Sequence, residues 1–414
     1  MGLIDEYFGY QMEYEEKYGK KTVVLYQKGS FYNIYEYDPE CQNLNGEAER
    51  SNERSQKEKE YGLKRMGHAV HLSSILNMHL TQDNTKKPYS YYNPHMIGFP
   101  VISYEKHRDK ILSENFTIVR IDQKGKNKNV ERYVGEIVSP ATLIDDLKNI
   151  PVTNTICSIY IECQKRKQYS KFEDYLITCG ISCVDITTGK NIVCEVYSKE
   201  NDEIYAVQEI YRFLKSKYPR EIIINIYGLK KEEKEKYKNF LWKVFELSNY
   251  SNVAIHCSEE KKEYLKCDYQ KELFLKVFNE HPKSPKIDKV KRSGRQLKIV
   301  GYNRPQFNKE NIFDILNLGK LSYGRTSYTF LLQYCYEHNE TLIRKLDYPE
   351  TTWLDEDKHL ILTHNAITQL DVFPNSHLSK NKFYGNEHEN NQSLFEVIKN
   401  TSTSLGERYL INRL

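Results

Sequence analysis

The chain has 414 residues, of which 39% are hydrophobic and 29% charged, and its formal net charge is +4. This length exceeds the usual size of one hydrophobic core, and the charge balance gives no overall nucleic-acid signature, so we expect a multidomain globular protein. No apolar run approaches the roughly 18 residues of a membrane span, and the acidic start gives no signal peptide, so we expect no membrane role. Nine scattered cysteines favour a reducing, intracellular compartment over a disulfide framework.

Residues 1–145 are predicted to form a mixed α/β domain. Apolar and aromatic residues recur at helical spacing up to Gly19, a natural helix end, and the β-branched run TVVLYQ then indicates a strand over 22–27. The polar stretch 42–60 is typical of a mobile surface insertion. The further elements expected in this domain are a helix over 68–80, a helix from about Ser103 and a strand over 117–121.

A second domain, of the α/β or α+β class, is predicted over residues 150–285. Two strands flank the turn at 187–190, and a helix over 202–216 precedes another strand over 221–228. Hairpin strands followed by a crossover helix and a further strand are typical of this class. The strands expected before the helix lie over 158–163, 176–186 and 191–198.

Residues 286–414 are predicted to be a linker followed by the start of an all-α domain. From Lys286 to Arg325 ten basic residues accompany three acidic ones. Such a run suits phosphate contact and a solvated linker equally well. The last helix reaches Leu414 without a cap, so we expect the chain to end inside a domain. The helical segments expected here lie over 326–338, 359–370 and 393–414.

Motifs that bind nucleotides or metals are weak in this sequence. Neither G-x-x-x-x-G-K-[ST] nor G-x-G-x-x-G occurs, so we expect no nucleotide pocket. The candidate metal ligands are His68, His71 and His79, then Cys179 and Cys183, and finally Asp145 and Asp146. The histidines lack a second cluster at ligand spacing, the cysteines suit buried positions in an apolar strand, and the acidic pair suits a solvated turn. We therefore expect no metal site.

The stretch GSFYNIY, residues 29–35, places a glycine and an aromatic pair where a strand ends. Glycine allows a sharp turn, and alternate side chains of the strand that follows face opposite sides. Either Phe31 or Tyr32 must then point away from the core. One reading is a half-exposed aromatic at a sheet edge. The other is an apolar wedge that pushes between base steps of DNA.

The surrounding sequence resembles the mismatch-recognition domain of the MutS family. Residues 18–38 are similar to the family's strand followed by Gly-[Asp/Ser]-Phe-Tyr-Glu. LTQDNTKKPYSYYNPHMIGFP, residues 80–100, is similar to the family's L-T-K-R-G and P-M-A-G-I-P segments. NVERYVGEIVSPAT, residues 129–142, is similar to V-x-R-x-V-x-x-I-V-T-P-G-T.

The resemblance continues in the same order through the rest of the chain. CVDITTG, residues 183–189, is similar to a motif of the family's RNase H-like connector domain. Residues 364–371 and 393–414 are similar to the first helices of its core or lever domain. Residues 337–350, with 363–371, resemble the variant of giant viruses and octocoral mitochondria. The resemblance therefore implies a recognition domain, a connector domain and the start of a helical lever domain.

The resemblance also implies roles for residues of the first domain. Phe31 takes the position of the phenylalanine that stacks on a mispaired base, and Met96 that of a methionine near the same minor groove. Lys86 and Lys87 fall in a loop that approaches the DNA backbone. Core packing of the methionine and solvation of the lysines remain the alternatives. Asn33 replaces the family's glutamate, so we expect weaker discrimination of mispairs and tighter general binding.

The expected function is mismatch recognition on double-stranded DNA, with no catalytic residue in this chain. The family's ATPase segment, which would use ATP and Mg²⁺ and form the homodimer, is absent from these residues, so we expect neither ATP hydrolysis nor family-type dimerisation. The alternatives are a protein-interaction scaffold that no longer senses mispairs and a nuclease built on the connector. The cytoplasm or a viral factory, the nucleus and the mitochondrion all remain open as compartments.

Overall fold

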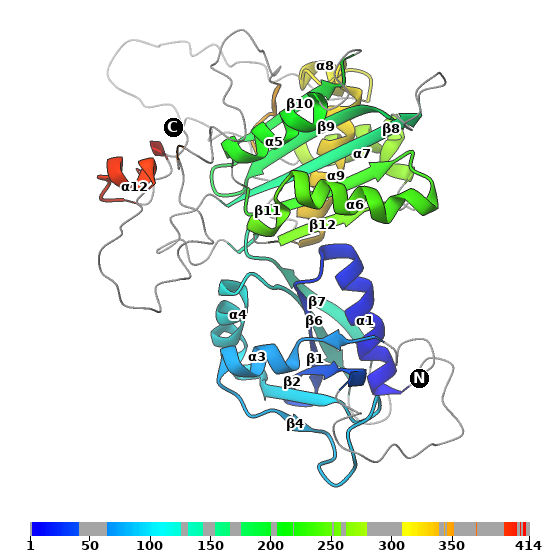
Figure 1. Ribbon diagram of the computed structural model, residues 1–414, viewed down its shortest axis with the longest axis vertical. Helices are drawn as coiled ribbons and strands as arrows, with labels where there is room; N and C mark the ends of the chain where they lie inside the picture. The colour runs from blue at the N-terminus through cyan, green and yellow to red at the C-terminus, as the bar shows by residue number, and fades with distance from the viewer. Residues whose placement is uncertain are drawn as a thin grey trace, which may run out of the picture. The chain divides into compact units, whose positions relative to one another are not determined.

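In a computed structural model the chain divides into two compact units, residues 1–143 with 251–254, and the remainder of the chain (Figure 1). The structure describes residues 2–40, 64–125, 131–143, 154–165, 175–199, 205–217, 219–250, 252–257, 262–279, 309–338, 343, 346–351, 370, 393–403, 406 and 409–410. The predicted insertion at 42–60, the pair Asp145 and Asp146, and most of the basic run lie outside the described residues. The predicted domain boundaries stay predictions.

The first unit is built on a mixed sheet with strand order β4-β5-β2-β1-β6-β7, and β3 pairs with β2. β1 runs parallel to β6 and antiparallel to β2, and β5 and β7 are antiparallel to their neighbours. The elements are α1 (Leu3–Tyr18), β1 (Thr22–Lys28), β2 (Phe31–Tyr37), β3 (Met66–Gly67), α3 (Ala69–Leu76), β4 (Thr81–Gln82), β5 (His95–Pro100), the 3-10 helix η2 (Val101–Ser103), α4 (Tyr104–Ser113), β6 (Thr117–Lys124) and β7 (Glu131–Val138).

Helices cover both faces of this sheet (Figure 1). α1 packs its aromatic residues on one face, where the ring of Tyr7 meets those of Tyr26 and Tyr35 edge to face. α3 and α4 pack on the other face, over a core that includes Ile34 and Ile97. The helix predicted to end at Gly19, the strands predicted over 22–27 and 117–121 and the helix predicted from about Ser103 are confirmed. The helix predicted over 68–80 ends at Leu76, because Asn77 adopts the left-handed conformation that terminates helices.

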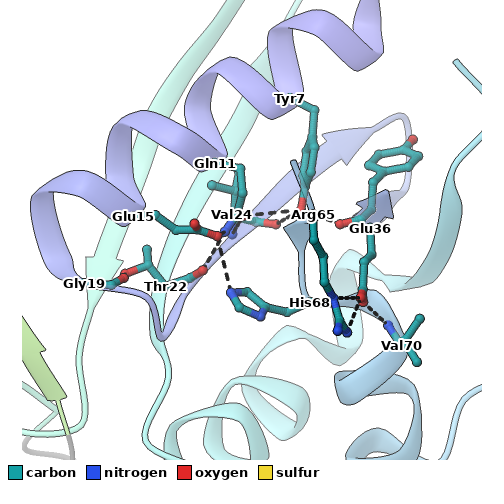
Figure 2. Close-up of polar contacts among 11 residues, drawn as sticks. Tyr7, Gln11, Glu15, Gly19, Thr22, Val24, Glu36, Arg65, His68 and Val70 are labelled. Carbon is teal, nitrogen blue, oxygen red and sulfur yellow. Dashed lines mark hydrogen bonds and ion pairs between the residues drawn. The ribbon is translucent and has the colours of Figure 1, made fainter. Parts of the chain in front are cut away.

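β1 and β2 pair only beside their connecting turn, and side chains of α1 fill the gap beyond it (Figure 2). Gln11 Nε2 donates to Thr22 O at 2.6 Å, and Val24 N donates to Gln11 Oε1 at 3.0 Å. The buried Tyr7 hydroxyl lies 3.4 Å from the carbonyl oxygens of Val24 and Tyr35. α1 therefore replaces the strand partner that β1 lacks here.

A second set of polar contacts ties β2 to the start of α3 (Figure 2). The buried Glu36 carboxylate accepts from Val70 N at 2.6 Å and from Arg65 Nη2 at 2.8 Å. The Val70 amide lies in the first turn of α3, where backbone N–H groups lack intrahelical partners and a negative charge is favourable. His68 Nε2 faces Glu15 Oε1 of α1 at 3.4 Å. These contacts fix α1, β2 and α3 relative to one another.

The second sheet has strand order β12-β11-β8-β9-β10-β13, and its strands belong to the second unit except for residues 252–254 of β12, which group with the first. β8, β9 and β10 form an antiparallel meander, and the crossover helix α5 leads to β11, which lies parallel to β8. The predicted order of hairpin strands, helix and strand is confirmed. The elements are β8 (Thr155–Lys165), β9 (Tyr175–Asp185), β10 (Asn191–Tyr197), α5 (Tyr205–Lys217), β11 (Glu221–Tyr227), α6 (Lys231–Val244), β12 (Asn252–His256), α7 (Cys267–Asn279), α8 (Ile312–Ile315), α9 (Ser322–His338) and β13 (Glu350–Thr351).

α9 packs directly on this sheet, although the sequence places it in the predicted helical part. A Cβ on Gly180 would lie 1.9 Å from Tyr323 O, so only glycine allows the helix to approach β9 this closely. Ser182 Oγ and Ser327 Oγ are hydrogen-bonded at 2.9 Å across the same contact. The helix is buried along most of its length, which stabilises it as part of the second unit's core.

The long helix predicted over 393–414 is interrupted: residues 394–398 and, among the described residues beyond 403, positions 406, 409 and 410 are helical. α12 (Leu394–Ile398) follows its N-cap Ser393, which forms a capping box with Glu396, and it ends before the extended Lys399. Residues 399–403 are not helical. The Asn-Thr-Ser-Thr run after Lys399 explains the break, because such side chains bond the local backbone in competition with the helix. The helix predicted over 359–370 lies outside the described residues except for Leu370.

Candidate nucleic-acid interface

The turn between β1 and β2 presents Phe31 at one end of the first sheet. Gly29 occupies the first position of a two-residue hairpin loop with φ of +64°, a conformation for which glycine is preferred. Gln123 of β6 accepts from Gly29 N at 3.1 Å through its side chain and donates its backbone N–H to Gln27 Oε1 at 2.7 Å. Gln27 Nε2 also donates to Gly29 O at 3.0 Å. The loop is therefore held by its neighbours.

Phe31 is the aromatic residue that points away from the core. Its side chain is 48% exposed, whereas Tyr32 is 4% exposed and packs against Phe99 and Tyr104 on the face covered by α4. Tyr32 Oη donates to Asp122 Oδ1 at 2.6 Å. Burial, and then this carboxylate, raise the pKa of the Tyr32 phenol, so it remains a neutral hydrogen-bond donor.

The Tyr32 contact belongs to a partly buried polar network that joins the hairpin to β6, β7 and α4. Arg120 pairs with Asp122 Oδ2 at 3.1 Å and with Glu136 Oε2 at 2.9 Å, and Tyr104 Oη donates to the same Glu136 oxygen at 2.9 Å. One guanidinium thus lies between two carboxylates that each also accept a tyrosine hydroxyl. Such charge-assisted bonds are stronger than neutral ones and restrict the geometry of the strands they join.

Asn33 lies on the same face of β2 as Phe31 but is 6% exposed. Its Nδ2 donates to the Tyr35 hydroxyl at 3.3 Å, and a Cβ on Gly98 of β5 would lie 2.5 Å from its Oδ1. The amide therefore packs over the Gly98 backbone and is turned into the sheet. The predicted base contact by Asn33 stays a prediction, and it would require this side chain to leave its buried position.

Met96 lies beside the same face, opposite Tyr35 in the register of β5 and β2, and is half-buried. The sheet therefore brings Phe31, Asn33 and Met96 to one face. Burial along β2 decreases from Tyr35 through Asn33 to Phe31, because the cover provided by α1 ends before the hairpin. Of these three side chains, Phe31 is the most exposed, at 48%.

Lys86 and Lys87 are exposed in the loop that follows β4, and no ion pair involves either ammonium among the described residues. The buried Asn93 holds this loop: its Nδ2 lies within 3.1 Å of the carbonyl oxygens of Asn84, Lys87 and Pro88, and its Oδ1 accepts from Asn84 N at 3.1 Å. The two lysines therefore extend from a loop with an ordered backbone.

The loop also touches the hairpin through an ion pair between Lys28 Nζ and Asp83 Oδ2 at 2.8 Å. Lys28 is opposite Phe31 in the β1/β2 register. Asp83 therefore pairs with the lysine that lies opposite Phe31 in the register.

Candidate metal ligands do not converge in the part of the chain that the structure describes, where no three His, Cys, Asp or Glu residues lie together as a metal site. Among the histidines, His68 faces Glu15 and His71 packs near the Phe116 ring. Cys179 and Cys183 are buried, and burial raises the pKa of the Cys179 thiol. No described helix is both long and apolar enough to span a membrane.

Comparisons with known proteins bear on this arrangement. Residues 66–147 match the family model described as MutS domain I. Over 412 residues the chain is 28% identical to a putative DNA mismatch repair protein mutS homolog of Acanthamoeba polyphaga mimivirus, covering 99% of this chain and 32% of that protein. The resemblance to the MutS family is confirmed.

A second relative is the mitochondrial DNA mismatch repair protein mutS homolog of Sarcophyton glaucum. It is 24% identical over 424 residues, which cover 99% of this chain and 38% of that protein. The chain thus spans about a third of the length of the curated MutS relatives it matches. The predicted similarity to the giant-virus and octocoral variant agrees with both matches.

Sequence reasoning missed the residues that hold the MutS domain I surface in place. Asn93 anchors the lysine loop, and Asp122 with Glu136 anchors the hairpin. Asn93 and Glu136 lie within segments that resemble the family, but at positions that its motifs leave unspecified, and Asp122 lies outside those segments. Gly98 gave a weak signal, because a glycine inside a strand often marks close approach of a neighbouring group. Asn33 itself supplied that group.

Proposed function

We propose that this chain is the mismatch-reading part of a MutS-like DNA mismatch repair protein, and that it binds mispaired double-stranded DNA with Phe31 as an apolar wedge in the minor groove. The observation that carries the proposal is the 48% exposed Phe31 ring on a hairpin loop held by Gln27 and Gln123. A side chain that separates two stacked bases must keep its position against their tendency to stack again, so a constrained loop favours this role. The confirmed MutS resemblance supports the same assignment.

Selection in this mechanism rests on deformability of the duplex. Separating a base step and kinking the DNA costs about a few kcal/mol, and the cost is lowest where pairing is already weak. Phe31 supplies the stacking surface that compensates for the lost base contact. Because the Asn33 amide is buried against Gly98, hydrogen-bond readout of the mispaired base contributes little in this arrangement.

The proposal assigns no catalytic residue to this chain and places the ATP and Mg²⁺ implied by the resemblance outside these 414 residues. It also assigns no family-type homodimer to the chain alone. DNA binding by a single copy without a partner should be weak and strongly salt-dependent, because phosphate neutralisation supplies most of its affinity.

The test is fluorescence anisotropy with one duplex that carries a single mispair and its matched counterpart. Phe31→Ala should reduce mispair affinity about tenfold or more while changing matched affinity little, since stacking on an aromatic ring is worth about 1–3 kcal/mol per base. Phe240→Ala, the same substitution at a 40% exposed position of α6, is the matched control. Unchanged mispair preference in Phe31→Ala would refute the wedge and favour the scaffold reading.

Asn33→Glu tests the contribution of position 33 to DNA binding. The carboxylate cannot donate to the Tyr35 hydroxyl as the amide does, so we expect the side chain to turn outward. Lower affinity for matched DNA and a higher preference for the mispair should follow from repulsion between the carboxylate and phosphates. If neither affinity changes, position 33 takes no part in DNA binding.

A further inference from the structure

Ile102 is the most exposed large hydrophobic side chain among the described residues, at 98%. A single exposed isoleucine is ordinary on a protein surface and by itself indicates nothing. Its attachment is more informative. Pro100 is opposite Phe31 in the β5/β2 register, and Val101 N donates to Ser30 O at 2.9 Å. Ile102 is therefore the next residue after an amide that is bonded to the Phe31 hairpin loop.

The helix that begins beside Ile102 carries unpaired positive charge. η2 runs directly into α4. Ile102, Lys106 and Lys110 are spaced four residues apart, so they lie along one side of this helical segment. Both lysines are exposed, and neither forms an ion pair with any residue that the structure describes. The four-residue spacing places the Cα atoms of the two lysines about 6 Å apart along the helix axis.

Acidic residues of α4 only partly offset this charge. Asp109 Oδ1 already accepts from Arg108 Nε at 2.9 Å, and Glu105 is exposed on the neighbouring side of the helix. The pKa of His107 is lowered by its burial and then by Lys106 and Lys110, which agrees with a positive potential along this side. An apolar tip followed by a row of cations suits a duplex better than an apolar partner surface.

We infer that the DNA-contacting surface extends from the Phe31 hairpin across η2 to α4, with Ile102 as a second apolar contact in the minor groove and Lys106 and Lys110 as phosphate contacts. The inference rests on the proposed function and adds three residues to it. Ile102 packs against the sugar and base edges next to the step that Phe31 opens. The lysines neutralise phosphates of the strand that leaves the kink.

The test uses the full 414-residue chain and the same mispaired and matched duplexes at a series of salt concentrations. Ile102→Ser should reduce mispair affinity about tenfold, as expected for partial loss of one buried aliphatic side chain, and should leave matched affinity within about twofold. Ile102→Leu should keep most of the affinity. Thermal melts should show no loss of stability, because the side chain is almost fully exposed.

The double variant Lys106→Gln/Lys110→Gln should weaken binding to both duplexes and reduce the slope of log affinity against log salt by about two, near one per lysine. Lys20→Gln/Lys21→Gln is the matched control, because both lysines are exposed at the opposite end of β1 from the hairpin. The control should leave the slope unchanged.

The outcomes separate this inference from the proposed function. If the wild-type chain does not prefer the mispair, the proposed function itself fails. If it does, and Phe31→Ala removes the preference while Ile102→Ser and the α4 double variant bind as wild type, only the inference is overturned, and the Ile102 surface would then be open to a protein partner. If Ile102→Ser weakens mispair binding but the lysine double variant binds as wild type, only the phosphate contacts are overturned.

Discussion

Replacing Gln11 by leucine should destabilise the first unit by about 2–4 kcal/mol. Gln11 is fully buried, and its side-chain amide donates to Thr22 O and accepts from Val24 N. These backbone groups of β1 lie beyond the paired part of β1 and β2, so β2 does not bond them. Leucine has a similar size but offers neither donor nor acceptor. Each buried backbone group left without a partner costs about 1–3 kcal/mol, and the added apolar contact of leucine offsets part of the sum.

Hydrogen exchange gives the sharpest assay, because the chain has two units and a single global melt need not be two-state. The amide of Val24 should exchange faster in Gln11→Leu, together with the rest of β1, while β8 to β11 of the second unit keep their protection. Glu16→Leu, at an exposed position of the same helix, is the control. A change below about 1 kcal/mol, or faster exchange in both units alike, would contradict the role assigned to Gln11.

Three further predictions concern particular residues. Gly98→Ala should destabilise the first unit by about 1–3 kcal/mol, because the new methyl would lie 2.5 Å from Asn33 Oδ1, and adding Asn33→Ser should recover most of the loss in a double-mutant cycle by urea denaturation. Gly9→Ala should stabilise α1 by about 0.5–1 kcal/mol in the same assay, since nothing lies within 4 Å of the added Cβ. Burial raises the pKa of the Glu195 carboxyl despite its bonds from Gly324 N and Tyr323 N. The folded state therefore holds this proton more tightly than the unfolded state, and stability should fall as pH rises through the raised pKa, a dependence that Glu195→Gln should lack in paired denaturation curves.

The sequence was sufficient for elements whose patterns are local. The β-branched run at 22–27, the glycine at position 19 and the hairpin turn at 187–190 each follow from residues within a few positions, and the structure confirms them. The helix expected over 393–414 is interrupted after Ile398, although its apolar spacing continues and residues 406, 409 and 410 are again helical. Local bonding by Asn, Thr and Ser residues accounts for the interruption.

The arrangement of the candidate site depended on contacts that sequence spacing does not encode. Alternation required one of Phe31 and Tyr32 to face outward, but the choice follows from Tyr32 reaching Asp122 across β1. The burial of Asn33 likewise depends on a glycine 65 positions away in sequence, whose missing side chain makes the space. Such pairs are set by strand register, which becomes visible only in three dimensions.

Under the proposed function, Asn93 would influence DNA affinity although it is itself buried and uncharged. Its amide bonds three carbonyl oxygens and one N–H of the 84–88 segment, so the loop that carries Lys86 and Lys87 is ordered before any ligand arrives. Loss of those bonds would leave the charge of the loop unchanged, yet binding would then have to fix the backbone of several residues at about 1–2 kcal/mol each. If this surface binds DNA as proposed, its affinity would reflect conformational entropy already lost during folding as well as charge.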